Sequence, residues 1–313
     1  MAELPVTPDD VERAAALVRG RLHRTPVFSA RSLRDGLSLK AELFQRTGSF
    51  KPRGVLTNLA ALSAAERRRG VISVSAGNHA QALAWGAREE GIDALLVMWQ
   101  GASAAKVAAT RAYGAVVDLE AADPTEAFAR LDELIDATGR VFVHPFDAPG
   151  TIAGQGTVGL EILDDVDGVD TIVVPCGGGG LVSGIAVACV PAGVRVIAVE
   201  PEGSAALAEG LAAGAPVPVT PRSVADALAA PFAGRLAVEL CSALGVPVVT
   251  VSDDEIREAF RVLYARAKLA VEPGAAASLA AVARGRVDGE RIVVVVSGGN
   301  VAAETASDIL AGR

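Results

Sequence analysis

Four consecutive glycines, Gly177 to Gly180, stand between a run of β-branched residues at 171–174 and a helical pattern that opens at Leu181. Because glycine has no Cβ, the backbone N–H groups of such a loop can converge on one anion. The N-terminus of the following helix adds the positive end of its dipole. No Lys-Ser/Thr pair follows, so the loop is not a P-loop, and no GxGxxG motif with a downstream ribose acid is present. The segment predicts a phosphate cradle, with an ordinary turn as the alternative.

Lysine is rare in this arginine-rich chain, and one lysine lies in a short polar motif. Only four lysines occur among the 29 basic residues, and Lys51 stands in the segment Gly-Ser-Phe-Lys-Pro-Arg-Gly at 48–54. An amine can form a Schiff base with a carbonyl group, which a guanidinium cannot. Taken alone, Lys51 also fits a solvated lysine at the start of a helix. Beside a phosphate cradle it indicates covalent chemistry.

Two more polar segments follow apolar runs. Residues 75–79, Ser-Ala-Gly-Asn-His, offer a hydroxyl, an amide and an imidazole at a strand–helix junction, where free helix N–H groups could hold a carboxylate. An N-capping serine with a packed histidine is the alternative. Residues 297–300, Ser-Gly-Gly-Asn, form either a turn or a place for one hydroxyl against a ring nitrogen. His23 and His144 have no acid or nucleophile near them in sequence, and we expect them to be structural.

Apolar runs alternate with alanine-rich helical stretches and must position these segments. The runs are continuous, which is typical of strands buried on both faces of a parallel sheet. Strands are predicted at residues 71–74, 94–97, 116–119, 141–143, 171–174, 194–199, 248–251 and 292–296. Helices are predicted at residues 78–90, 125–138, 181–190 and 254–268, and Thr7 is expected to cap a first helix from Pro8. The pattern predicts an open α/β fold that binds its ligand beyond the C-terminal ends of the strands.

Composition excludes several other classes of protein. The 313 residues are 51% hydrophobic with a formal net charge of −8, and the pI is about 5.1. These values argue against a disordered chain and against a dominant nucleic-acid surface. No uninterrupted apolar run approaches about 18 residues, so no membrane span is predicted. Cys176, Cys189 and Cys241 have no zinc or disulfide spacing. We therefore expect a protein of the reducing cytoplasm.

A lysine able to form a Schiff base and a phosphate cradle together indicate pyridoxal 5′-phosphate (PLP). Along nearly its full length the chain resembles the serine/threonine dehydratase (threonine ammonia-lyase) and serine racemase family of fold-type II PLP enzymes. The motifs that carry this resemblance lie at residues 23–27, 48–54, 75–81, 152–157, 177–180, 272–273 and 297–300. The resemblance implies a homodimer whose subunits have two open, mostly parallel α/β domains. Residues 1–62 and 148–313 would form the larger, PLP-binding domain, and residues 63–147 the smaller one on the substrate side.

The resemblance also assigns residues to the cofactor. It implies that Lys51 forms the Schiff base and transfers the proton, and that Phe50 packs near the cofactor ring. Asn78 would hydrogen-bond the 3-oxygen, and Ser297 would face the pyridine nitrogen. The phosphate would be held by Gly177, Gly178, Gly179 and Gly180. With a neutral hydroxyl opposite its nitrogen, the cofactor ring would be a weaker electron sink than with a carboxylate there. A weaker sink disfavours a long-lived carbanion and suits prompt loss of a β-substituent.

The reaction implied by the resemblance is β-elimination. The substrate carboxylate would be surrounded by Ser75, Gly77, Asn78 and His79. L-Threonine or L-serine would lose its β-hydroxyl and then ammonia, giving 2-oxobutanoate or pyruvate. Alternatives are a dehydratase for another β-hydroxy amino acid such as 3-hydroxyaspartate, a serine racemase and a β-replacement synthase. A non-catalytic phosphate-binding α/β module is the alternative from another class, but it would have no use for a buried amine at position 51.

Three positions compare differently with the members of this family. Racemases of this family tend to carry a second serine where this chain has Ala76, and a methyl group cannot transfer a proton. Phe146 matches the dehydratase-like members better than the racemase-like ones. The usual Met-Pro pair is Met98-Trp99 here, which leaves the shape of that loop open.

The resemblance also points to a cation site. Divalent-dependent relatives use a glutamate, a backbone carbonyl four residues on and an acidic side chain two beyond that. Here these positions are Glu200, Ser204 and Ala206, so one carboxylate is missing. Magnesium is held mainly by carboxylates and water. We therefore expect either a monovalent cation such as K⁺ at Glu200 and Ser204 or no cation at all.

Overall fold

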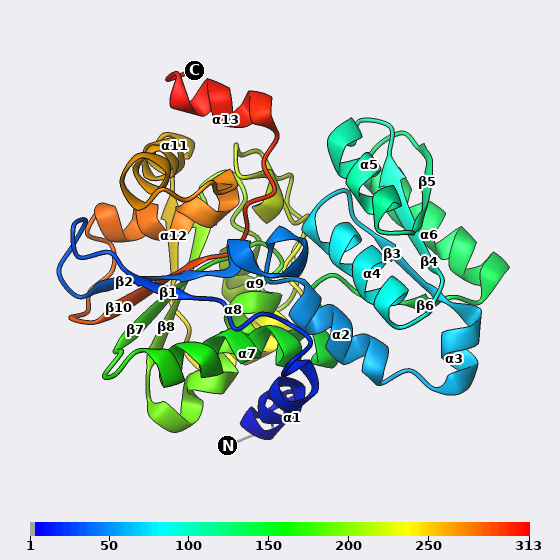
Figure 1. The fold of residues 1–313 in the computed structure, drawn as a ribbon, viewed down its shortest axis with the longest axis horizontal. Helices are drawn as coiled ribbons and strands as arrows, with labels where there is room; N and C mark the ends of the chain where they lie inside the picture. Colours follow the sequence, from blue (N-terminus) through cyan, green and yellow to red (C-terminus); the bar gives the residue numbers. More distant parts are fainter. Residues whose placement is uncertain (1–3) are drawn as a thin grey trace.

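Two sheets lie side by side in the computed structural model, which describes residues 4–313 (Figure 1). The larger sheet has six strands in the order β1-β2-β10-β7-β8-β9. All neighbours are parallel except β1 and β2, which are antiparallel. Its strands are β1 (Val27–Ser29), β2 (Leu37–Ala41), β7 (Thr171–Pro175), β8 (Arg195–Pro201), β9 (Val248–Val251) and β10 (Ile292–Val296). The predicted open, mostly parallel arrangement is confirmed.

The smaller sheet has four parallel strands in the order β5-β4-β3-β6. They are β3 (Val71–Val74), β4 (Ala94–Trp99), β5 (Val116–Ala121) and β6 (Val141–Phe142). All four lie within the range 63–147 expected for the smaller domain. The domain boundaries themselves stay a prediction, and residues 1–3 of the larger domain fall outside the described part of the chain.

Helices cover both faces of the two sheets. They are α1 (Pro8–Val18), α2 (Pro52–Ala60), α3 (Ala64–Arg69), α4 (Asn78–Glu89), α5 (Ala104–Ala112), α6 (Pro124–Thr138), α7 (Pro149–Asp165), α8 (Gly180–Cys189), α9 (Ala206–Ala213), α10 (Arg235–Ala243), α11 (Asp253–Val262), α12 (Pro273–Ala283) and α13 (Ala303–Leu310). Short 3₁₀ turns form η1 (Glu42–Phe44), η2 (Arg46–Gly48), η3 (Val190–Ala192) and η4 (Asp226–Leu228), and η5 (Leu263–Ala267) is a π-helix that continues α11. Thr7 caps α1 as expected, since its side chain accepts from the N–H of Asp10. No helix within residues 4–313 has the length and apolarity that a bilayer span requires.

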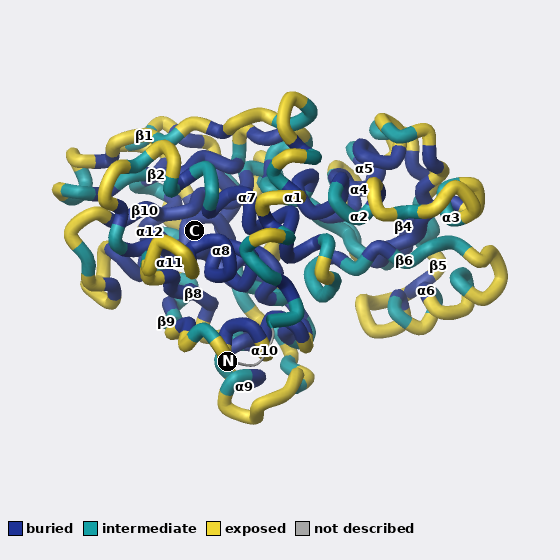
Figure 2. The backbone as a smooth tube through the Cα atoms, turned by 90° about the horizontal axis from the view of Figure 1, so that it is seen from below, coloured by how far each residue is buried: buried dark blue, intermediate teal, exposed yellow. Residues whose placement is uncertain are grey.

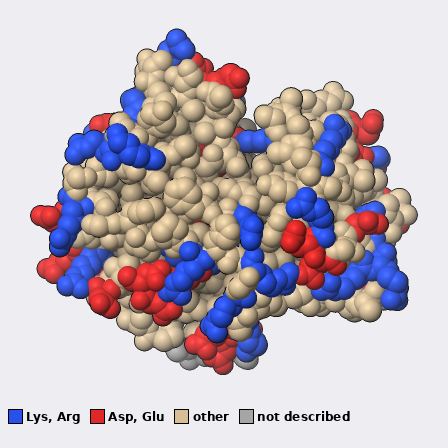
Figure 3. Space-filling model, in the orientation of Figure 1, with Lys and Arg blue, Asp and Glu red and all other residues tan. Residues whose placement is uncertain are grey.

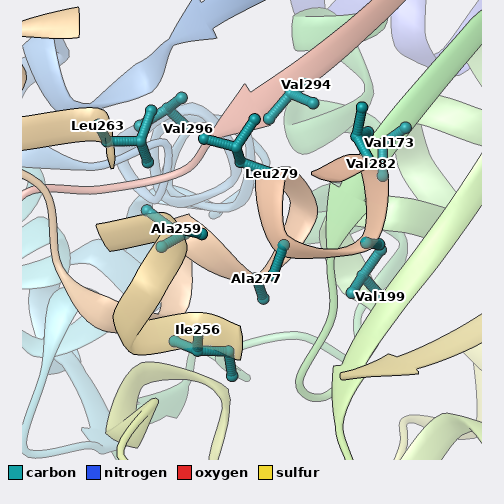
Figure 4. Close-up of a cluster of buried hydrophobic side chains, with 14 of the residues drawn as sticks. Val173, Val199, Ile256, Ala259, Leu263, Ala277, Leu279, Val282, Val294 and Val296 are labelled. Carbon is teal, nitrogen blue, oxygen red and sulfur yellow. The ribbon is translucent and has the colours of Figure 1, made fainter. Parts of the chain in front are cut away.

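Both faces of the central strands of the larger sheet are buried, and successive side chains of one strand alternate between them. Val294 and Val296 of β10 pack toward α11 and α12, together with Val173 and Val199 (Figure 4). The intervening residues of β10 pack on the other side with α7 and α8. Figure 2 shows β8 and α8 buried, whereas the outer turns of α6 and α11 are exposed. This two-sided burial is why the strands read as continuous β-branched runs.

The sequence pattern missed β1 and β2. The sequence of β2, Leu-Ser-Leu-Lys-Ala, is interrupted by polar residues, yet Lys40 is completely buried. Its amine donates to a carboxylate oxygen of Glu161 at 2.6 Å and to the carbonyl of Thr25 at 2.8 Å. A buried charge is tolerated only when it is paired and hydrogen-bonded, and here the partner lies 121 residues away in the chain.

The buried guanidinium of Arg53, two residues after Lys51, joins this charged cluster. Arg53, in the first turn of α2, donates two hydrogen bonds of 2.8 Å to Glu42 and two of 2.8 and 2.9 Å to Glu161. Burial disfavours the charge of Arg53, but the two carboxylates outweigh it and raise the pKa of the guanidinium above its ordinary value. The bidentate pairs fix the start of α2 against η1 and α7.

On the face of the molecule shown in Figure 3, acidic and basic side chains are interspersed.

We expect Arg53→Met to lower the free energy of unfolding by about 3–5 kcal/mol, because Glu42 would stay buried without a counter-charge. Urea unfolding followed by circular dichroism measures this change. The matched control is Arg257→Met, whose partner Asp254 has a side chain that is 95% exposed, and we expect a change within about 0.5 kcal/mol. A loss below about 1 kcal/mol in Arg53→Met would show that the buried pairs are not needed for stability.

Candidate active site

A cavity of about 640 Å³ opens between the two sheets, at the C-terminal ends of β3, β4, β7 and β10. Ligands of open α/β proteins bind at this end of the strands. The cavity lining includes eleven of the residues that the resemblance assigned, together with Cys176 and Leu181, which flank the glycine loop. The eleven are Phe50, Lys51, Ser75, Gly77, Asn78, His79, Gly177, Gly178, Gly179, Gly180 and Ser297. Glu200 and Ser204 lie elsewhere. The structure therefore brings together segments that are up to about 250 positions apart, while their roles toward PLP stay predictions.

Lys51 stands at the N-cap position of α2, is half-buried and lines the cavity. The amine donates to the carbonyl of Pro145 at 2.9 Å and lies 5.1 Å from the centre of the Phe50 ring. Burial lowers the pKa of the amine to about 8, and the carboxylate of Glu272 opposes part of that effect. The lowered pKa makes the unprotonated amine, which a nucleophile or base requires, more accessible near neutral pH than in an exposed lysine.

The glycine loop connects β7 to α8 and permits no side chain. Gly179 has a φ of +89°, in the left-handed region that favours glycine. A Cβ on Gly178 would collide with the ring of Phe146, and one on Gly180 would lie 2.7 Å from the Phe146 carbonyl oxygen. The N–H groups of the first turn of α8 have no partner within the helix. The loop therefore fits a phosphate group, and with the buried amine it fits PLP.

Ser297 follows β10 and is almost fully buried against the Lys51 segment. Its carbonyl accepts from the N–H of Phe50 at 3.2 Å, and Ser49 pairs with Gly298 in an isolated β-bridge. These contacts hold the end of β10 next to Phe50 and Lys51, although the segments lie far apart in the chain.

Glu272 is a cavity residue whose role the sequence did not reveal. Its carboxylate accepts from the amide of Asn78 at 2.8 and 3.1 Å. Asn300 donates to the amide oxygen of Asn78 at 2.8 Å and to the carbonyl of Thr47 at 2.7 Å. Burial raises the pKa of Glu272 to about 7, and the nearby Asp226 adds to the shift. The network fixes which way the Asn78 amide faces. In the sequence, only the motif Glu272-Pro273 pointed to Glu272.

The imidazole of His79 is not free to meet a substrate. Its Nε2 lies 3.0 Å from Ser73 Oγ and 3.1 Å from the carbonyl of Val143, and burial lowers the pKa of the ring to about 3. What His79 offers to the cavity is its backbone N–H in the first turn of α4. The Nδ1 of His144 accepts the N–H of Asp147 at 2.9 Å, which fits its expected structural role.

Glu200 uses its carboxylate inside the protein. The two oxygens accept from the N–H groups of Leu207 and Ala208 at 2.7 and 2.9 Å, at the start of α9. Burial raises the pKa of this carboxyl to about 7. The hydroxyl of Ser204 donates to the carbonyl of Leu228 at 3.0 Å. Residues 4–313 contain no group of three or more His, Cys, Asp or Glu side chains arranged for a metal ion, and a cation at Glu200 and Ser204 stays a prediction.

Comparison with known proteins places these features in a family. The family model described as pyridoxal-phosphate dependent enzyme matches residues 18–298. The catabolic L-threonine dehydratase TdcB of Escherichia coli K12 is 39% identical over 319 aligned positions, covering 98% of this chain and 97% of that one. The phenylserine dehydratase of Ralstonia pickettii is 40% identical, covering 97% and 98%. The structure of maize serine racemase superimposes with a TM-score of 0.91 at 35% identity, covering 98% and 97%. The chain therefore belongs to the pyridoxal-phosphate dependent enzymes and has their fold-type II architecture.

Proposed function

We propose that the chain is a lyase that deaminates L-threonine and L-serine to 2-oxobutanoate and pyruvate. The single observation that carries this proposal is the buried Lys51 amine, which lies in one cavity with the glycine loop. The similarity to the threonine dehydratase TdcB over nearly the full length of both chains supports the choice of reaction.

The residues present fit PLP. The glycine loop (Gly177–Gly180) would hold its phosphate, Lys51 its carbonyl carbon, and Phe50, Asn78 and Ser297 its ring. When bound, PLP supplies the electron sink that stabilises negative charge at the substrate Cα.

The chain's own residues would orient the substrate and move its proton. The free N–H groups of the first turn of α4, together with Ser75, would hold the carboxylate. The Lys51 amine would take the Cα proton, because a base with a pKa near the working pH is the most effective one. The β-hydroxyl leaves with a proton as water, and the released enamine takes up one water and loses ammonia. The balance for L-threonine is one 2-oxobutanoate and one ammonia, with no net water.

The residues that line the cavity favour some alternative substrates over others. A second substrate carboxylate, as in 3-hydroxyaspartate, would need a free cation, but Lys106 is paired with Asp226 at 2.6 Å. The relative named phenylserine dehydratase adds β-aryl serines as candidates. Ala76 lines the cavity and provides no group for a second proton transfer, which argues against a racemase.

A cytoplasmic homodimer completes the proposal. The free, buried cysteines Cys176, Cys189 and Cys241 fit a reducing compartment. Sedimentation equilibrium would test the subunit number.

We expect Lys51→Ala to abolish deamination of L-serine and L-threonine while the far-UV circular dichroism stays unchanged. Loss of a general base alone typically costs about 10²–10⁴-fold in rate, and here the attachment point of PLP is lost as well. Formation of 2-oxo acid measures the activity, with the exposed Lys268→Ala as the matched control. Deamination by Lys51→Ala above the background without enzyme would refute the proposed function.

A second expectation concerns Ala76. We expect negligible D-serine from L-serine in the unmodified protein, because no hydroxyl stands at position 76 to donate a proton to the opposite face of Cα. Ala76→Ser should raise D-serine formation detectably, and chiral chromatography measures it. Appreciable racemisation by the unmodified protein would mean that another group serves that face.

A third expectation concerns the cation. We expect activity to survive EDTA and not to rise with Mg²⁺, because Ala206 provides no second carboxylate. Assays of the chelated enzyme in sodium, potassium and magnesium buffers separate a K⁺ requirement from no cation requirement. A severalfold activation by Mg²⁺ that disappears in Glu200→Ala would contradict this ligand assignment.

A further inference from the structure

Aromatic side chains concentrate on one side of the active-site cavity. The chain has only 12 aromatic residues among 313, namely eight Phe, two Trp and two Tyr. Four of them line this cavity: Phe50, Trp99, Phe128 and Phe146. Phe50 lies beside Lys51, at the end assigned to the cofactor. The other three are half-buried, so each keeps apolar surface that the protein itself does not cover.

These rings form an aromatic wall, in which Phe232, a residue that does not line the cavity, links Phe146 to Phe128. Phe146 packs over Gly178, and its ring meets the ring of Phe232 edge-on with centroids 5.7 Å apart. Phe232 in turn lies 6.3 Å from Phe128 of α6. Trp99, at the end of β4, packs into the same apolar cluster as Phe128. The wall therefore joins both sides of the cleft.

The lining also includes the apolar residues Val219, Pro221 and Leu228, together with Thr125, Thr220, Lys106 and Asp226. The amine of Lys106 is engaged by Asp226. A substituent that extends from the substrate Cβ toward this wall therefore meets ring faces and edges, which prefer another aromatic ring at centroid distances of about 4.5–7 Å.

We propose that Trp99, Phe128 and Phe146 form an aryl subsite and that the enzyme accepts β-hydroxy-α-amino acids with an aromatic β-substituent, such as L-3-phenylserine. This inference rests on the proposed function, since it names a substrate class for the same site. A methyl or hydrogen substituent leaves the three rings in contact with water, whereas a phenyl group covers them.

The test compares ligands that bind but have no β-hydroxyl to lose. Absorbance titration of the PLP-loaded enzyme measures the dissociation constants of L-phenylalanine and L-alanine. We expect L-phenylalanine to bind at least about tenfold more tightly, as expected when one phenyl ring is buried among aromatic partners. Phe128→Ala should reduce this preference to within about threefold. Phe128→Leu keeps apolar volume, so its preference should lie between those of the unmodified enzyme and Phe128→Ala. The control Phe44→Ala removes an exposed ring that does not line the cavity and should keep the full preference.

Turnover of L-3-phenylserine and L-serine by the same variants provides the second measurement. We expect Phe128→Ala to lower the ratio of the two kcat/KM values at least about tenfold, in line with the ligand preference. Equal binding of L-phenylalanine and L-alanine would overturn the subsite, as would a preference that Phe128→Ala leaves intact. If the preference is present but no β-hydroxy amino acid is deaminated, the proposed function fails and the subsite stands. If L-serine is deaminated without any aryl preference, only the subsite fails.

Discussion

Burial of the Lys51 amine between the two sheets is the constraint on which the rest of the site depends. Removal from water lowers the pKa of the amine to about 8, so that it can act near neutral pH. The segment that carries Lys51 must also be held in place between the sheets. Arg53, two residues on, holds it through bidentate pairs with Glu42 and Glu161. Removal of Arg53 would leave Glu42 buried without a counter-charge, whereas Glu161 would keep its pair with Lys40.

The parallel sheets supply the other components of the site at one end. Because all strands except β1 run parallel within their own sheet, the segments after β3, β7 and β10 all open toward the same cavity. Each segment is short and rich in small residues, so backbone N–H groups rather than long side chains face the ligand. The hydrogen bond from Phe50 to Ser297 and the contact of Phe146 with Gly178 then fix these segments relative to Lys51.

Local features of this site could be predicted from the sequence, and features that depend on distant partners could not. The glycine loop and the eight β-branched strands are each recognisable within about ten residues. β2 was missed because Lys40 can be buried only with Glu161, which is 121 positions away. The role of Glu272 was hidden for the same reason, because its partner Asn78 lies 194 positions earlier. His79 could not be assigned to a core role until Ser73 and Val143 were placed beside it.

The most direct test of the central claim is to identify the amine that holds PLP. The purified yellow enzyme is reduced with borohydride, which fixes the cofactor covalently to that amine, and is then digested and analysed by mass spectrometry. The account predicts that the modified peptide carries the cofactor on Lys51. Lys106 is the informative competitor, because it also lines the cavity but is paired with Asp226. Modification of Lys106 or Lys40, with Lys51 left free, would contradict the account.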